Sequence, residues 1–168
     1  MIEPANIKPG QFVKVTLGQL AVQKARESLG VREDKPYRNR GKWIDIYTGF
    51  LGLVGVPWCA AFVAFKIHQA AKQMGIKSRW PKAPWAASCD AVYRWALRNG
   101  LILAKPEPGC VFLVGSPADY THMGFVERVR GMMCDTLEGN TNDDGSREGY
   151  EVCARSRPSA QLTFIKID

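Results

Sequence analysis

The segment 47–65, YTGFLGLVGVPWCAAFVAF, decides how the chain is interpreted, because it is long and contains no charged residue. Its length is about that of a membrane-spanning helix. However, Gly49, Gly52, Gly55 and Pro57 divide its first half into turn-like pieces. We therefore expect a glycine-rich loop followed by a buried helix, and we expect no membrane span.

The buried helix carries a cysteine near its start. We expect Pro57 to occupy the first helical position, the apolar run WCAAFVAFKI to follow it, and the helix to continue to about Gly75. Cys59 then lies in the first turn, where unpaired N–H groups and the positive end of the helix dipole favour a thiolate. A buried cysteine is more often an inert apolar residue. A partner base is therefore needed before Cys59 can be assigned a catalytic role.

The sequence contains two histidines as candidate bases, and only one of them can reach Cys59. His68 follows nine residues later on the same helix, which rotates it by about half a turn and moves it about 13 Å along the axis. We interpret it as a surface histidine. His122 opens the predicted strand HMGFVERV, and Gly124, on the same face of that strand, leaves room beside the imidazole. A nucleophilic Cys59 with His122 as its base is the resulting hypothesis.

A catalytic imidazole usually needs a third group that fixes its tautomer and stabilises its charge. The next predicted strand ends in TLEGN, where Glu138 and Asn140 are two residues apart and project from the same face. In an antiparallel hairpin this end lies beside His122, so either side chain can orient the ring. The alternative is that both belong to a polar turn, since EGNTNDDGS is rich in turn-forming residues.

The order of the predicted elements is helices first and strands afterwards. A Thr16/Gln19 capping box opens a helix that closes on Gly30, and a further helix occupies 84–100. A short apolar piece is expected at 43–47. Short β-rich segments then follow, namely GCVFLVG, HMGFVERV, MMCDTLEGN, YEVCARS and QLTFIKI. This order predicts a single α+β domain over 1–168, with an extended lead over 1–15 and an antiparallel sheet packed on the Cys59 helix.

Composition excludes several classes of protein. The net charge of +7 is concentrated in residues 1–80, which hold 13 Lys/Arg and 5 Asp/Glu. This basic half is either a solvated face or a surface for an anionic polymer, and no nucleic-acid-binding signature accompanies it.

The N-terminus does not resemble a signal peptide. Five cysteines without C-x-x-C spacing, and two histidines, predict neither a disulfide framework nor a metal site, although a Cys134–Cys153 bridge remains open under oxidising conditions.

The segments VPWCAAFVAF, PGCVFLV, THMGFVERV and TLEGNTN, in this order, resemble the CHAP family of cysteine peptidases and amidases, which are related to NlpC-type cell-wall hydrolases. The similarity extends upstream to ARESLGVRE and WIDIYTGF. One departure is Cys110, where the family more often has Asp. The resemblance implies a papain-like α+β fold, with N-terminal helices packed on a C-terminal antiparallel β-sheet. It also implies Cys59 as nucleophile, His122 as base, and Glu138 and Asn140 as supporting residues.

The resemblance further implies cleavage of amide bonds in bacterial peptidoglycan, within the stem peptide or between glycan and peptide, without a metal or other cofactor. We expect a phage endolysin or an antibacterial effector, made in the cytoplasm and delivered to the wall by a holin or a secretion system. An effector would have an immunity or inhibitor protein as partner. The alternatives are a thiol amidase acting on a non-wall peptide or polyamine conjugate, and a non-catalytic wall-binding module. Cys89, Cys110 and Cys153 are expected to be dispensable for activity.

Overall fold

The chain folds into helices followed by one antiparallel sheet, as seen in a computed structural model that describes residues 14–141 and 149–167. The helices are α1 (Leu17–Arg26), α2 (Lys42–Gly49), α3 (Cys59–Met74) and α4 (Cys89–Arg98), with short 3-10 turns η1 (Trp85–Ala87) and η2 (Ser159–Gln161). The strands are β1 (Ile102–Leu103), β2 (Val111–Val114), β3 (His122–Arg130), β4 (Met133–Thr141), β5 (Glu151–Pro158) and β6 (Leu162–Ile165).

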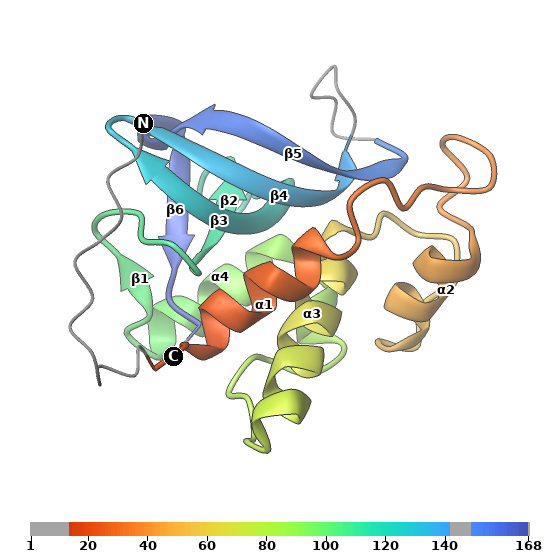
Figure 1. The fold of residues 1–168 in the computed structure, drawn as a ribbon, viewed down its shortest axis with the longest axis horizontal. Helices are drawn as coiled ribbons and strands as arrows, with labels where there is room; N and C mark the ends of the chain where they lie inside the picture. The colour runs from red at the N-terminus through yellow and green to blue at the C-terminus, as the bar shows by residue number, and fades with distance from the viewer. Residues whose placement is uncertain (1–13, 142–148, 168) are drawn as a thin grey trace, which may run out of the picture.

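The described strands form a six-stranded sheet in the order β1-β6-β2-β3-β4-β5, with antiparallel neighbours throughout. Helices α1 and α3 lie side by side beneath this curved sheet (Figure 1). The predicted α+β class, with N-terminal helices on a C-terminal antiparallel sheet, is therefore confirmed. Most of the predicted extended lead, and the polar turn after Thr141, fall outside the described residues. The single-domain assignment over 1–168 stays a prediction.

Helix α1 begins with the predicted capping box. The Thr16 hydroxyl accepts a hydrogen bond from the Gln19 N–H at 3.1 Å, and the Gln19 side chain accepts one from the Thr16 N–H at 3.0 Å. Two of the N–H groups that a helix start leaves unpaired are thereby satisfied. The helix ends at Arg26, earlier than the predicted Gly30. Its buried side chains pack against α3 and β3, so α1 supports the helix that carries Cys59.

Helix α3 runs through the interior, as its apolar composition predicts. It begins at Cys59 rather than at Pro57, because Trp58 has φ −120° and ψ 11° and is the residue before the first helical turn. It ends at Gly75, whose φ of 66° is left-handed and favours glycine. Ten of its residues are buried. The nucleophile candidate is therefore the first residue of the central helix.

Two other sequence expectations are corrected by the structure. The predicted helix over 84–100 is divided at Ser88, whose hydroxyl accepts a hydrogen bond from the Ala91 N–H and caps α4. The short apolar piece expected at 43–47 belongs to helix α2, which contributes Tyr47 to the core with no exposed surface.

The two faces of the sheet form separate apolar clusters. Met123 and Phe125 of β3 belong to the main core between the sheet and helices α1 and α3, whereas Val126 packs in a smaller cluster on the other face, with Cys110, Phe112, Cys134 and Phe164. This is the predicted alternation of β3. The Cys134–Cys153 bridge does not form, because the register of β4 and β5 pairs Cys134 with Arg157 and Cys153 with Glu138. None of the five cysteines, all of which lie within the described residues, forms a disulfide.

Candidate active site

Three of the predicted site residues meet where the start of α3 faces the sheet. Cys59 opens α3, His122 opens β3, and Glu138 lies in β4 with no exposed surface. The His122 Nε2 atom is 2.8 Å from Glu138 Oε2. His122 Nδ1 is buried and has no hydrogen bond of normal geometry to any other described residue. The thiol of Cys59 interacts with this imidazole.

The Glu138 contact fixes the state of the ring. A carboxylate only accepts hydrogen bonds, so the Nε2 atom carries the proton that it donates to Glu138. The lone pair of the neutral ring is then on Nδ1, the nitrogen left for Cys59. The geometry therefore gives His122 the tautomer that can take a proton from the Cys59 thiol.

Glu138 is held as a buried carboxylate by residues other than His122. Arg157 donates two hydrogen bonds to it, both at 2.7 Å, and the Thr136 hydroxyl donates a third at 2.5 Å. Burial alone would raise the pKa of Glu138, but Arg157 and then His122 outweigh it and lower the pKa to about 2. Glu138 is thus negatively charged throughout the physiological range and faces the imidazole with its full charge.

The charges on Cys59 and His122 stabilise each other. Burial alone would lower the pKa of His122, but its interactions with the Cys59 thiolate and with Glu138 raise it to about 9. The pKa of Cys59 is well below the usual value, and the largest cause is a hydrogen bond from Cys89. Burial alone would raise this pKa, whereas His122 and the Met123 backbone N–H lower it further. Both pKa shifts favour a thiolate–imidazolium pair at this site.

Cys89 is a contributor that the sequence did not indicate. It is the first residue of α4, buried beside Cys59 in the main core. Its pKa is strongly raised by its hydrogen bond with Cys59 and by burial, so it stays a thiol and donates its S–H to the thiolate. It cannot be grouped with the inert cysteines. Within a single sequence, nothing local distinguishes it from the other apolar residues of the predicted helix.

Asn140 does not reach the imidazole. Its backbone has φ 57°, and the pairing of β4 with β5 shifts between Glu138 and Thr141, so the regular alternation that would place Glu138 and Asn140 on one face is broken. The Asn140 side chain is buried, and its Oδ1 atom has no partner among the residues that the structure describes. Of the two candidate orienters, only Glu138 bonds to His122.

Trp58, the residue before Cys59, is fixed by a buried carboxylate. The Trp58 indole donates a hydrogen bond to Glu33 at 3.0 Å, and Glu33 also accepts the backbone N–H groups of Arg38 and Asn39. The other side of Trp58 lies against Gly139, where a Cβ would come within 2.7 Å of the ring. Glu33 and Gly139 thereby position the first turn of α3. Sequence reasoning missed Glu33, because it lies in a polar, turn-rich stretch.

Gly124 was expected to leave room beside the imidazole, but the structure shows that it allows close packing elsewhere. A Cβ there would meet the Leu137 carbonyl oxygen and the Phe112 ring, each at 2.8 Å, rather than the imidazole. The Phe112 ring in turn lies 6.2 Å from that of His122. Gly124 therefore lets β3 approach β4 closely and lets Phe112 pack beside His122.

The described residues contain no group of three or more His, Cys, Asp or Glu side chains that could hold a metal ion. The same part of the chain contains no helix with the length and apolarity needed to cross a membrane.

Comparison with known proteins identifies a family. The CHAP domain model matches residues 52–140, a range that includes Cys59, His122, Glu138 and Asn140. No curated protein matches the chain. A solved structure, "The crystal structure of Ly7917", is similar at 16% identity and a TM-score of 0.49, over 89% of this chain and 62% of that one, so the chain spans less than two thirds of its length. Because the family model covers more than half of the chain, the chain belongs to the CHAP-domain family, whose members are in general amidase- or peptidase-type hydrolases.

Proposed function

We propose that the chain is a cysteine hydrolase that cleaves amide bonds of bacterial peptidoglycan. The observation that carries the proposal is the buried arrangement of Cys59, His122 and Glu138, in which a thiol at a helix start faces the free nitrogen of an oriented imidazole. Membership of the CHAP family supports the same chemistry and the wall as substrate. The intact set of three groups argues against a non-catalytic wall-binding module.

The reaction follows from the charges of the site. The Cys59 thiolate attacks the carbonyl carbon of the amide, and the electrons of the C=O bond move to its oxygen. Trp58 makes no side-chain cap to α3, so the first N–H groups of the helix, including that of Cys59, are available to stabilise this oxyanion. The imidazolium of His122 then protonates the leaving amine as the C–N bond breaks, which leaves a thioester on Cys59.

Hydrolysis of the thioester completes the cycle. Neutral His122 takes a proton from water, the resulting hydroxide attacks the thioester carbonyl, and the Cys59 thiolate leaves with the imidazolium restored. Glu138 keeps its charge throughout and stabilises the imidazolium in both halves of the reaction. Each step uses only groups that the site already brings together.

The biological setting belongs to the same proposal. The cleaved bond would be a stem-peptide bond or the N-acetylmuramoyl-L-alanine bond, and the role would be wall lysis by a phage endolysin or an antibacterial effector. Delivery would be by a holin or a secretion system, and an effector would be held in check by an immunity protein. The basic excess of the first half supports contact with anionic wall polymers.

Digestion of purified peptidoglycan, followed by mass spectrometry of the fragments, tests the proposal. We expect new amino groups and fragments whose ends identify one amide bond. Pre-treatment with iodoacetamide should abolish their release, and prolonged treatment with a chelator should not. Hydrolysis of a peptide or polyamine amide with intact peptidoglycan left behind would instead favour a thiol amidase with a non-wall substrate.

A further inference from the structure

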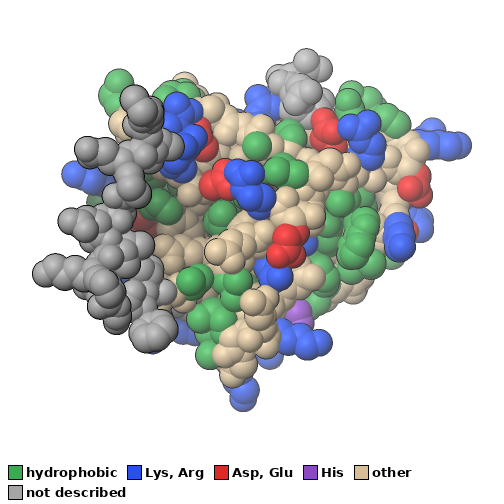
Figure 2. Space-filling model, viewed as in Figure 1, with side chains coloured by type: hydrophobic (Ala, Val, Ile, Leu, Met, Phe, Trp, Pro, Cys, Tyr) green, Lys and Arg blue, Asp and Glu red, His purple; other side chains and the backbone are tan. Residues whose placement is uncertain are grey.

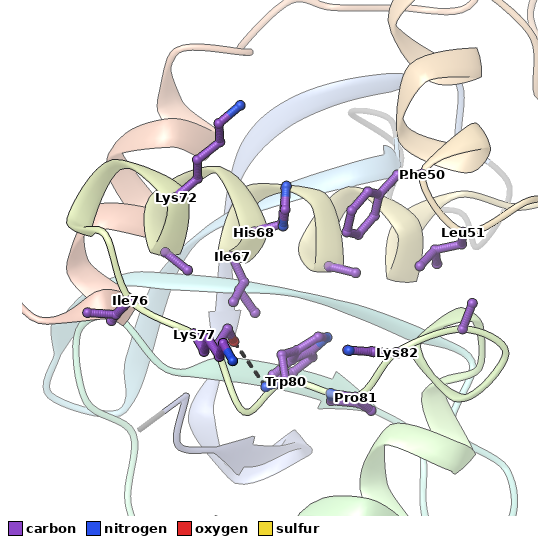
Figure 3. A pocket seen from close by; sticks show the side chains of 14 residues that line it. Phe50, Leu51, Ile67, His68, Lys72, Ile76, Lys77, Trp80, Pro81 and Lys82 are labelled. Atoms are coloured by element: carbon purple, nitrogen blue, oxygen red, sulfur yellow. Dashed lines mark hydrogen bonds between the residues drawn. The ribbon is translucent and has the colours of Figure 1, made fainter.

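A cavity of about 710 Å³ lies on the side of α3 away from the catalytic residues, and none of Cys59, His122 and Glu138 lines it. Figure 3 shows α3 forming one wall, with Ile67 and His68, while the segment 76–83 forms the opposite wall. The volume is in the range of sites for small molecules and cofactors.

The inner walls of this cavity are apolar. Ile67, Ala71 and Leu51 are buried side chains that face it, and Trp80 and Pro81 close it from the opposite segment. The Ser78 hydroxyl oxygen accepts the Trp80 backbone N–H at 3.0 Å, which leaves the Ser78 O–H and the His68 ring as the few neutral polar groups of the lining. A sugar or a peptide needs many hydrogen-bond partners that such walls do not provide, whereas an acyl chain needs none.

The rim of the cavity is cationic. Lys72, Lys77 and Lys82 are exposed and surround it, and no Asp or Glu occurs among the described residues that line it (Figure 3). None of these three lysines forms an ion pair within the described part of the chain. Three uncompensated cations at the mouth of an apolar cavity favour a ligand with a negatively charged head.

A buried donor points to the same ligand. Trp80 is only 7% exposed, and its indole Nε1–H has no hydrogen-bond partner among the described residues. Buried polar groups are rarely left unpaired, because each one costs free energy. An oxygen acceptor on a bound ligand would satisfy this group.

The surface beside the cavity extends the apolar contact. Trp43, Ile46 and Phe50 follow each other at intervals of three and four residues along α2 and are 39–45% exposed, and Phe50 also lines the cavity. Ile76, on the opposite rim, is 45% exposed. Hydrophobic side chains, with Lys and Arg nearby, are visible on the side of the molecule where α2 lies (right in Figure 2). A single small ligand would leave Trp43 and Ile46 uncovered, but a membrane surface would cover them.

We propose that this face of α2 and α3 binds an anionic membrane, with one acidic phospholipid entering the cavity by an acyl chain and placing its phosphate among Lys72, Lys77 and Lys82. This inference goes beyond peptide-bond hydrolysis and does not depend on it. It would hold the enzyme at the membrane surface while Cys59, at the far end of α3, stays free for its substrate.

Co-sedimentation with vesicles tests this site. The protein should bind vesicles containing phosphatidylglycerol and should not bind pure phosphatidylcholine. A variant with Lys72, Lys77 and Lys82 replaced by Gln should bind roughly 100-fold more weakly, since each lysine near an anionic surface contributes several-fold. The matched control replaces the exposed Lys14, Lys105 and Lys166 by Gln and removes the same charge elsewhere; it should bind within a few-fold of the wild type.

Two further variants separate the lipid pocket from general charge attraction. Trp80→Phe keeps an aromatic side chain, although a smaller one, and removes the unpaired N–H; it should weaken binding about tenfold, as expected for a lost hydrogen bond to a charged group. Ile76→Ser should weaken vesicle binding by severalfold. Equal losses in both triple variants, or no effect of Trp80→Phe, would overturn the assignment of a specific site. Binding of soluble dodecanoate without any binding to vesicles would overturn the membrane as its source.

Discussion

Replacement of Glu138 by glutamine is the most informative change to the site, because it keeps the shape of the side chain and removes its charge. The carboxylate accepts hydrogen bonds from His122, from Thr136 and twice from Arg157. A glutamine amide can accept at one oxygen only, so at least one of the Arg157 bonds is lost. If the oxygen stays toward His122, the ring keeps its orientation but loses the negative charge beside it.

The magnitude follows from the contact distances. Two unit charges about 4 Å apart, at the effective dielectric constant of a protein near 20, interact by about 4 kcal/mol. Arg157 would remain, with its positive charge now facing the imidazolium without compensation. We therefore expect Glu138→Gln to lower kcat/KM roughly 10²- to 10⁴-fold, as for other catalytic groups that support a histidine.

The pH dependence of Cys59 alkylation by iodoacetamide provides the assay, with peptide mapping to identify the modified cysteine. In Glu138→Gln the imidazolium is less stable, so the pKa of Cys59 should rise and alkylation at low pH should slow. The companion variant Glu138→Gln with Arg157→Met removes the unpaired cation as well. It should recover thermal stability and remain nearly inactive. An unchanged alkylation profile in Glu138→Gln, or recovered activity in the double variant, would refute the role of Glu138.

Three further predictions concern groups around this site and in the core. Cys89→Ala should raise the pKa of Cys59 and slow its alkylation near pH 6 about tenfold, because a hydrogen bond to a charged group is lost; Cys110→Ala should leave the profile unchanged. The rate of wall hydrolysis should fall as the pH rises through about 9, where His122 loses its proton; a rate that is constant to pH 10.5 would contradict the ion pair. Lys66, only 4% exposed and stacked on the Tyr47 ring, has its pKa lowered to about 8 by burial. At pH 7, the free energy of unfolding of Lys66→Met should therefore be about 1–2 kcal/mol higher than that of the wild type. In denaturant titrations this difference should disappear as the pH rises from 8 to 10.5, because above that range Lys66 is neutral in both the folded and the unfolded state.

The fold could be predicted largely because its signals are local. The capping box at Thr16, the apolar run after Cys59 and the change to two-residue alternation at His122 are each readable within a few residues. The start of helix α3 was predicted less accurately, because it depends on contacts with residues that are distant in the sequence. Helix α3 starts at Cys59 because Glu33, far away in the sequence, holds the indole of Trp58.

The candidate site could be predicted only as far as its residues carried a local signal. Cys59 and His122 were identified by their positions at the start of a helix and of a strand. The charge of Glu138 and the family resemblance favoured it over Asn140, but the strand pattern alone placed both on one face, and the irregular backbone at Asn140 breaks that alternation. Arg157 and Cys89 reach the site only through the pairing of β4 with β5 and the packing of α4. Such contacts are a property of the tertiary fold.

The release of new amino groups from purified peptidoglycan by Cys59→Ala, compared with the wild type, tests the central claim most directly. Circular dichroism should show that the variant is folded, since alanine fits a site whose own side chain is small and buried. Cys110→Ala, which alters a buried thiol on the opposite face of the sheet, serves as the matched control and should retain activity. We predict that Cys59→Ala loses at least about 10³-fold in rate, as when other nucleophiles are removed. Peptidoglycan cleavage by Cys59→Ala at a rate close to that of the wild type would contradict the account.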